Sequence, residues 1–267
     1  MVRSAEPLAV ASRRSPVRQT VEMGGRKLDP DALDEYAETY YLNADVEDID
    51  IEERAQRHSV PALLKAVAGR DRVLEMGYGT GLITSELLAH DVPLEVLEGS
   101  PALSEHACRR HPGLTVHTAM FEEFRGSDLG AVLALHVLEH VDDPVSLLGV
   151  IRQWLTPHGV LVAVTPNAQS IHRQLAVRMG LHANLDDLSP RDHLVGHKRV
   201  YTLAELRSTL EAGGFDVIDE FGYFVKPLSN AQMLDWSNDL LDGFNALADV
   251  VPAWLCANIG VVARRRD

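Results

Sequence analysis

The stretch RVLEMGYGTG, residues 72–81, joins a short apolar run to three closely spaced glycines. The apolar run is typical of a buried strand, and the residues that follow, 80–90, are typical of a helix. Glycine is needed where a chain turns sharply and where the backbone must come within contact of a ligand. The order of strand, glycine turn and helix therefore predicts a ligand-binding loop at the edge of a sheet.

Similar apolar runs recur along the chain and alternate with helical segments. Further strands are predicted at 93–99, 114–119, 130–136 and 158–166, and helices at about 101–111 and 143–155. Continuous apolar runs indicate strands buried on both faces, and helical crossovers force such strands to run parallel. The last third predicts a helix at 202–215 and two strands, 215–225 and 257–265, around a helical stretch at 229–248. The fold class is therefore α/β, with a doubly wound, mostly parallel sheet.

The composition argues against several classes of partner. The 267 residues carry a formal net charge of −14, which disfavours broad binding to the phosphates of nucleic acid. No apolar run approaches the roughly 20 residues of a membrane helix. The two cysteines, Cys108 and Cys256, have no ligand-like spacing and suggest a reduced, cytoplasmic protein. We expect a small-molecule partner, and the sequence leaves monomer and homodimer open.

The N-terminal residues differ in charge from the rest of the chain. Residues 1–27 carry six basic residues against two acidic ones and are predicted to form a disordered tail. Residues 31–54 carry ten acidic residues against one basic, with tyrosines among them. We therefore predict a helical lid over 28–57, followed by one domain over 58–267. Substrate-side insertions in that domain are expected at about 167–200 and 226–254.

The glycine spacing and two acids narrow the ligand. A dinucleotide-binding loop would place its third glycine where Leu82 stands. Glu75 lies two residues before Gly77, where its carboxylate would repel a pyrophosphate but favour a ligand with an ammonium and a sulfonium. Glu98 ends the second strand and could accept hydrogen bonds from both hydroxyls of a ribose. These residues predict a positively charged adenosine cofactor without phosphates.

Four segments in this order resemble the class I S-adenosylmethionine-dependent methyltransferases. They are VLEMGYGTG (73–81), LEGS (97–100), LALHVLEHVDDP (133–144) and VLVAVTPN (160–167). The likeness is nearest to small-molecule enzymes of quinone biosynthesis and natural-product tailoring. It implies a seven-stranded sheet with an antiparallel last strand, S-adenosyl-L-methionine as methyl donor and S-adenosyl-L-homocysteine as product.

The resemblance also implies which residues surround the cofactor. By position they are Tyr41, Glu75, Gly77, Tyr78, Gly79, Gly81, Glu98, Gly99, Met120, Phe121, Leu135 and His136. Many relatives carry Gly-Asp-Ala after the third strand, with the Asp near the adenine amine. Here Thr118-Ala119-Met120 takes its place, so adenine recognition would rest on backbone groups, Met120 and Phe121. Tyr78 is bulkier than the usual residue, and its role stays open.

Histidine is the expected catalytic residue, because a base with a pKa near neutrality helps remove a proton from a hydroxyl or amine acceptor. The candidates are His136, His193 and His197. Residues 136–140, HVLEH, match an inverted zinc-protease motif. That motif belongs on a long helix and here begins at a strand's end, so no metal is predicted.

The atom that accepts the methyl group is not fixed by these patterns. We expect an oxygen or nitrogen atom of a small molecule, and natural-product biosynthesis is one expected source of that molecule. Carbon methylation and a cofactor-binding protein without catalysis stay open as alternatives. The acidic segment predicts an amine-bearing or cationic acceptor through its negative potential.

Overall fold

The computed structural model describes residues 29–43, 46 and 48–267. The predicted basic tail, residues 1–27, lies outside this part of the chain. The longest described α-helix has 11 residues, and no described helix is both long and apolar enough to span a bilayer.

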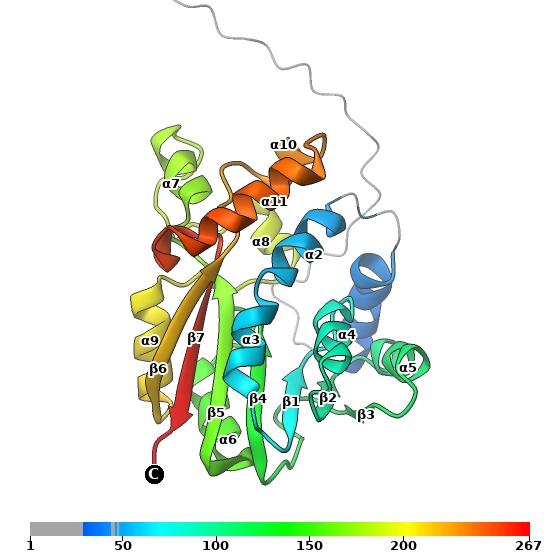
Figure 1. Ribbon diagram of the computed structural model, residues 1–267. Helices are drawn as coiled ribbons and strands as arrows, with labels where there is room; N and C mark the ends of the chain where they lie inside the picture. Colours follow the sequence, from blue (N-terminus) through cyan, green and yellow to red (C-terminus); the bar gives the residue numbers. More distant parts are fainter. Residues whose placement is uncertain (1–28, 44–45, 47) are drawn as a thin grey trace, which may run out of the picture.

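A sheet of seven strands forms the centre of the domain (Figure 1). The strands are β1 Val73–Met76, β2 Leu94–Glu98, β3 Thr115–Thr118, β4 Leu129–Leu135, β5 Leu155–Pro166, β6 Phe215–Tyr223 and β7 Asn258–Arg265. Their order is β3-β2-β1-β4-β5-β7-β6, and only β7 runs antiparallel to its neighbours β5 and β6. The predicted α/β class and the antiparallel last strand are both confirmed.

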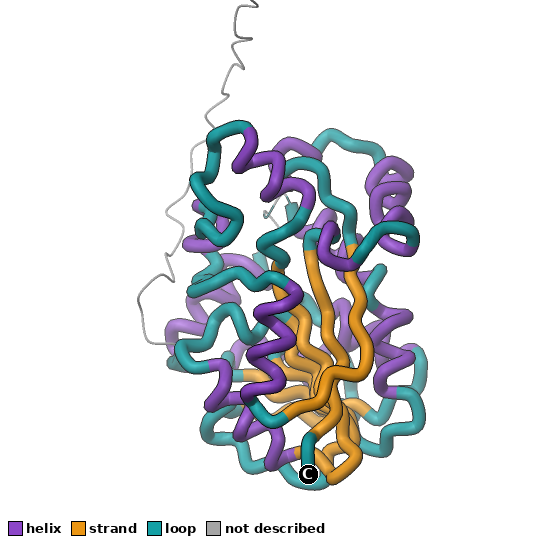
Figure 2. Tube along the Cα trace, turned by 90° about the vertical axis from the view of Figure 1, so that its left-hand side faces the viewer, coloured by secondary structure: helices purple, strands orange, loops and turns teal. Residues whose placement is uncertain are grey.

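Helices cover both faces of the sheet, as Figure 2 shows. They are α1 Pro30–Tyr36, a π-helix Ala37–Tyr41, α2 Ile49–Arg57, α3 Val60–Val67, α4 Leu82–Ala89, α5 Pro101–Arg110, α6 Pro144–Trp154, α7 Ile171–Arg178, α8 Pro190–Leu194, α9 Leu203–Ala212, α10 Asn230–Met233 and α11 Asn238–Ala246, with two 3-10 turns at Leu247–Asp249 and Ala253–Leu255. One apolar cluster joins the sheet to α6 and α9. A second cluster joins the opposite face to α2, α3, α4, α10 and α11.

Strand β4 explains why the apolar runs are continuous. Val132 and Ala134 pack into the first cluster, whereas Ala131 and Leu133 pack into the second. Successive side chains of a strand point to opposite faces, so burial on both faces requires an apolar residue at every position. Burying a side chain such as Leu133 completely contributes about 1.5–3 kcal/mol.

Three local predictions differ from the structure. The helix after the glycine loop begins at Leu82 rather than at 80, because Gly81 has a φ of +73° and caps the helix from the left-handed region. The helical stretch 229–248 is broken: α10 ends at Met233 and a new helix begins after Ser237, whose side chain accepts the Leu240 N–H. The sequence patterns also missed α7, and α8 within the polar loop.

Candidate functional site

The carboxyl ends of β1, β2, β4 and β5 open into one large cavity. Its volume is about 1570 Å³, and its wall is completed by α1, α2 and the segment that carries α7 and α8. Ordinary small-molecule pockets hold about 300–1,000 Å³. The cavity therefore has room for a cofactor and an acceptor molecule side by side, at the edge where the sequence predicted a ligand.

The glycine loop lines one end of this cavity. Gly77, Gly79 and Gly81 have φ angles of +80°, +55° and +73°, which residues with side chains adopt only under strain. A β-carbon on Gly79 would lie 3.7 Å from Tyr41 Cε1, so the lid packs directly against the loop. Nothing lies within 4 Å of a β-carbon on Gly77. The loop backbone is thus open to a ligand.

Tyr78 fills the space beneath the loop. A β-carbon on Gly81 would lie only 2.2 Å from the Tyr78 hydroxyl oxygen. The ring also packs edge-on against His106 and His111, at centroid distances of 5.8 and 6.1 Å. Tyr78 therefore requires glycine at position 81 and supports the loop, which gives this bulky residue a structural role.

Two buried carboxyl groups face the loop. Glu98 accepts hydrogen bonds from the Tyr78 and Ser100 N–H groups, both at 2.8 Å, which fixes its position. A carboxylate has further lone pairs, so Glu98 can still accept from ligand hydroxyls. Glu75 accepts a bond of 2.6 Å from the Thr84 hydroxyl, and burial raises its pKa to about 8.

The N-terminal helices close the cofactor end of the cavity. Asp34 accepts hydrogen bonds from the Ser100 hydroxyl and from the Ala102 N–H, the latter at 3.0 Å. A β-carbon on Gly99 would lie 2.5 Å from Leu33 Cδ1 and 3.2 Å from Met120 Sδ. These contacts place α1 across the loop after β2.

The sequence of the chain matches a known family. Residues 49–220, more than half of the chain, match the family described as a methyltransferase domain. The chain belongs to this family. Its methyltransferase domain is of class I, the type that depends on S-adenosyl-L-methionine, as the sequence motifs predicted.

Relatives of this methyltransferase include the ubiquinone biosynthesis O-methyltransferase of Dinoroseobacter shibae, which is 30% identical over 59% of this chain and 65% of that protein. A probable S-adenosylmethionine-dependent methyltransferase of Mycolicibacterium smegmatis is 30% identical over 63% of this chain and 62% of its own. The chain thus spans a little under two thirds of the length of these relatives.

Solved structures share the fold of the methyltransferase. A possible histamine N-methyltransferase of Thermotoga maritima has a TM-score of 0.58 at 15% identity, covering 85% of this chain and 97% of its own. An N-methyltransferase of Bradyrhizobium japonicum, in complex with S-adenosyl-L-homocysteine, has a TM-score of 0.55 at 14% identity and covers 88% and 99%.

The residues at the loop fit the cofactor of the family. Open glycine backbone, the buried carboxyl of Glu75, which a cation beside it would ionise, and the further lone pairs of Glu98 suit a ligand with an ammonium group and ribose hydroxyls. Tyr41, Met120, Phe121 and Leu135 also line the cavity, as the resemblance implied. When bound, S-adenosyl-L-methionine supplies a methyl group on a sulfonium, which is an activated leaving group.

His136 lines the cavity but has both ring nitrogens engaged. Nδ1 lies 3.1 Å from Glu139 Oε1, and Nε2 lies 2.9 Å from the Tyr223 hydroxyl. Burial opposes protonation of His136, but the hydrogen bond and charge of Glu139 outweigh it and raise its pKa. The backbone of His136 has a φ of +56°, which turns the ring toward β6. With both ring nitrogens engaged, His136 is poorly placed to take a proton from a ligand.

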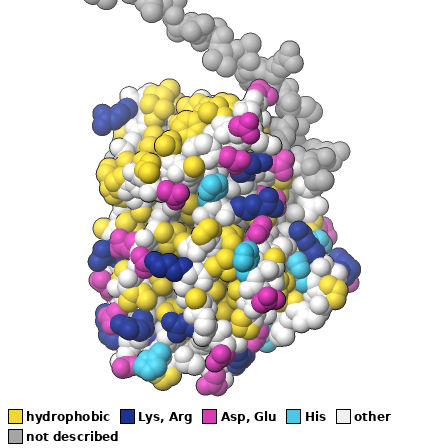
Figure 3. All heavy atoms as spheres, viewed as in Figure 1, with side chains coloured by type: hydrophobic (Ala, Val, Ile, Leu, Met, Phe, Trp, Pro, Cys, Tyr) yellow, Lys and Arg dark blue, Asp and Glu magenta, His cyan; other side chains and the backbone are white. Residues whose placement is uncertain are grey.

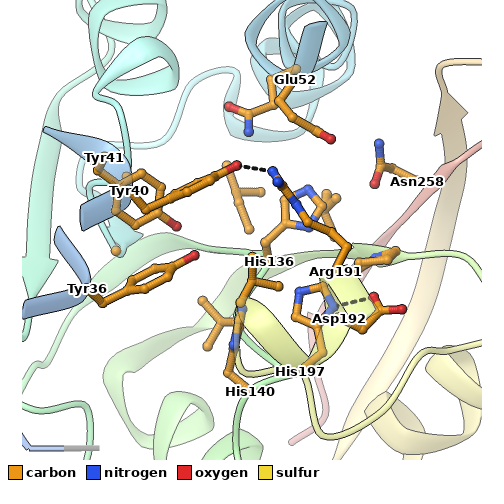
Figure 4. Close-up of a pocket in the computed structure, with 18 of the residues that line it drawn as sticks. Tyr36, Tyr40, Tyr41, Glu52, His136, His140, Arg191, Asp192, His197 and Asn258 are labelled. Atoms are coloured by element: carbon orange, nitrogen blue, oxygen red, sulfur yellow. Dashed lines mark hydrogen bonds and ion pairs between the residues drawn. The ribbon is translucent and has the colours of Figure 1, made fainter. Parts of the chain in front are cut away.

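The other two candidate histidines have different surroundings. His193 is exposed and is not among the described residues that line the cavity. His197 lines it, with Nδ1 2.8 Å from Asp192 Oδ1 (Figure 4). Asp192 also accepts a bond of 2.6 Å from Arg173. Burial would raise the pKa of Asp192, but the His197 hydrogen bond and the Arg173 charge hold it well below its usual value.

Glu139, His140 and His197 form a cluster that could hold a metal ion. Each offers one ligand atom, and these atoms lie within 4.8 Å of one another. Glu139 Oε2 is buried without a hydrogen-bond partner, and burial lowers the pKa of His140 to about 4, which keeps its imidazole neutral. The HVLEH pattern contributes only two members of this cluster. The third, His197, is 57 positions after His140, so motif spacing could not find it.

Arg191 connects α8 to the lid, and sequence reasoning did not single it out. Its guanidinium donates to the Tyr40 hydroxyl, lies 5.1 Å from the centre of the Tyr40 ring, and pairs with Asp48 at 3.0 Å (Figure 4). The next residue, Asp192, holds His197. Two consecutive residues, Arg191 and Asp192, therefore connect the N-terminal segment to His197. We call the part of the cavity around His197, away from the glycine loop, the acceptor half.

We expect Arg191→Met to weaken S-adenosyl-L-homocysteine binding about tenfold, because a partly exposed charged pair contributes on the order of 1 kcal/mol and the lid needs it to stay closed. Calorimetry gives the affinity, and hydrogen exchange of residues 30–41 gives lid closure. Tyr40→Phe keeps the ring and loses only the hydroxyl, so a smaller effect is expected. Equal lid protection by the ligand in Arg191→Met and wild type would contradict this role.

The rim of the cavity is apolar on the side of α7. Leu175, Met179 and Leu181 line the cavity, and Met179 and Leu181 are 61% and 70% exposed. Figure 3 shows hydrophobic side chains gathered at the end of the molecule where α7 and α10 lie. An acceptor that enters past this rim meets apolar surface before it reaches the polar groups inside.

Proposed function

We propose that this methyltransferase transfers a methyl group from S-adenosyl-L-methionine to an oxygen atom of a small molecule, with His197 as general base. The observation that carries the proposal is the Asp192–His197 pair in the wall of the cavity that also holds the glycine loop. The relatives named as ubiquinone biosynthesis O-methyltransferases support oxygen as the accepting atom.

The pair has the arrangement that a histidine base requires. The low pKa of Asp192 keeps it ionised, and an ionised carboxylate can only accept, so Nδ1 of His197 carries the hydrogen. Nε2 then presents its lone pair, and no hydrogen bond to it is recorded within the described part of the chain. As the acceptor oxygen bonds to the methyl carbon and the carbon–sulfur bond breaks, Nε2 takes the hydroxyl proton.

Product analysis tests the accepting atom. A panel of phenols, anilines and activated carbon acids is incubated with the protein and S-adenosyl-L-methionine, and methylated products are located by mass spectrometry and NMR. O-methylated phenols are the expected products. Methylation of nitrogen or carbon alone would overturn the proposal in favour of those acceptors. Cofactor binding without any product would favour a non-catalytic binding protein.

Glu75 predicts a pH dependence of cofactor binding. The pKa of the Glu75 carboxyl is about 8, so this group is largely protonated near neutral pH in the free protein. The ammonium group of a bound cofactor would favour the ionised carboxylate, so cofactor binding near neutral pH should release a proton. Affinity for S-adenosyl-L-homocysteine should rise from about pH 6 to about pH 8 and then level off. Calorimetry in buffers of different ionisation enthalpy measures the proton. Glu75→Gln should release none at this site, and unchanged release would contradict the assignment.

The same carboxyl sets a stability trend in the ligand-free protein. In the folded protein the pKa of Glu75 is about 8, above the value of about 4.3 in the unfolded chain. The contribution of Glu75 to the stability of the folded state is therefore fully present below about pH 4.3 and is lost as the pH rises through about 8. Thermal unfolding of the free protein should therefore show lower stability at the upper end of this range, and Glu75→Gln should reduce the trend.

A further inference from the structure

We propose that the acceptor carries a carboxylate, and that Lys226 and His172 bind it at the end of the cavity opposite the glycine loop. This proposal rests on the proposed function, because it takes the reaction to be methyl transfer to an oxygen atom of a small molecule. Lys226 follows β6, which is one edge strand of the sheet, whereas Glu98 ends β2 near the other edge. Both proposed residues line the same cavity as the loop.

Lys226 places its ammonium group in the wall of the cavity, and among the described residues it has no direct partner. No hydrogen bond or ion pair of its side chain is recorded with any residue that the structure describes. Burial lowers its pKa, against the opposing charges of Glu52 and Asp48. Lys226 is half-buried in the wall of the cavity, and a cation partly withdrawn from water is stabilised by an anion in direct contact. A ligand carboxylate would supply that contact.

The acids closest to this region already have donors of their own. Asp48 pairs with Arg191 at 3.0 Å, and Glu52 accepts from the Asn230 side chain. The sequence predicted a cationic acceptor from the negative charge of the lid. Arg191 and Asn230 already neutralise or hydrogen-bond part of that charge. Within the described part of the chain, Lys226 is a cation of this wall that has no acid in contact with it.

His172, on the same wall, supplies a second group that has no hydrogen-bond partner among the residues the structure describes. Its Nδ1 is buried without a hydrogen bond, and burial together with the charge of Lys226 holds its pKa well below the usual value. A neutral imidazole has one N–H to donate. A carboxylate has two oxygens, so one can accept from Lys226 and the other from His172.

The apolar side chains around this wall strengthen such a contact. Leu175, Ala176 and Leu228 line the cavity with Lys226 and His172. Charge-assisted hydrogen bonds contribute more where water is excluded. The wall thus favours an anionic oxygen group over a neutral amide of the same shape, and disfavours an amine.

Matched probes test the charge of the acceptor. Calorimetry on protein saturated with S-adenosyl-L-homocysteine compares hydroxyphenylacetate with hydroxyphenylacetamide and tyramine. We expect the carboxylate to bind at least about tenfold more tightly than the amide, since charge-assisted hydrogen bonds contribute about 1.5–3 kcal/mol. Equal binding of acid and amide, tighter binding of tyramine, or no binding of the acid would overturn the proposal.

Substitutions of Lys226 and His172 test whether these two residues cause the preference for a carboxylate. Lys226→Met should abolish the preference for the carboxylate, Lys226→Arg should retain part of it, and His172→Ala should reduce it, all with unchanged S-adenosyl-L-homocysteine affinity. Lys198→Met is the matched control, because Lys198 lines the cavity but is already paired with Asp142. A preference that survives Lys226→Met would overturn the proposal. Selective binding of the acid without O-methylation would instead count against the proposed function alone.

Discussion

Gly79→Arg is expected to abolish cofactor binding while the protein remains folded. Gly79 has a φ of +55°, and a β-carbon there would point toward Tyr41, 3.7 Å away, in the space between the loop and the lid. An arginine side chain would fill that space, and the left-handed backbone adds about 1–2 kcal/mol of strain. Calorimetry should show a loss of S-adenosyl-L-homocysteine affinity of at least about a hundredfold.

Gly243→Ala is the matched control for this variant. Gly243 lies in α11, where nothing stands within 4 Å of an added β-carbon and the backbone is helical. This change should leave cofactor affinity unaltered and stabilise the fold by about 0.5–1 kcal/mol, the usual gain from glycine to alanine in a helix. Wild-type affinity in Gly79→Arg would mean that the cofactor binds elsewhere.

His197→Ala is expected to have the second largest effect, on turnover. Removal of a general base typically lowers kcat by about 10²–10⁴-fold, and cofactor affinity should change little because His197 lies outside the loop. The rate is measured with an acceptor found in the product panel. His193→Ala, on the same segment but exposed, should behave like wild type.

A loss of turnover in His197→Ala could also arise because His197 is a metal ligand, and the turnover assay can distinguish a metal ligand from a general base. Glu139, His140 and His197 could jointly hold a divalent cation. If a chelator abolished methyl transfer and an added divalent cation restored it, His197 would act as a metal ligand, and the assignment as a free base would be wrong. Activity that is insensitive to chelator supports the base.

The sheet could be predicted from the sequence because its strands are buried on both faces. Leu74, Val132 and Val162 are fully buried, at positions where only apolar residues fit. In the sequence this constraint produces continuous stretches of apolar residues. The broken helix near Ser237 was missed because its apolar spacing continues across the break. Capping by one serine decides the boundary there.

It could also be predicted that Glu75, Gly77, Gly79 and Glu98 line one cavity, because they lie next to strands whose ends meet at one edge. The acceptor half could not be predicted. His136 has a left-handed backbone that turns its ring to Tyr223, 87 residues later, and nothing local in the sequence indicates this. The short spacing between Asp192 and His197 was the available signal for the base, but the contact of His197 with His140 depends on tertiary packing.

A crystal structure with S-adenosyl-L-homocysteine tests the central claim most directly, namely that one cavity aligns the methyl donor with a base. We predict the ribose hydroxyls on Glu98, the ammonium beside Glu75, and the sulfur facing the half of the cavity that contains His197. A complex in which the sulfur faces a closed wall, or in which the ligand lies away from the glycine loop, would contradict the account.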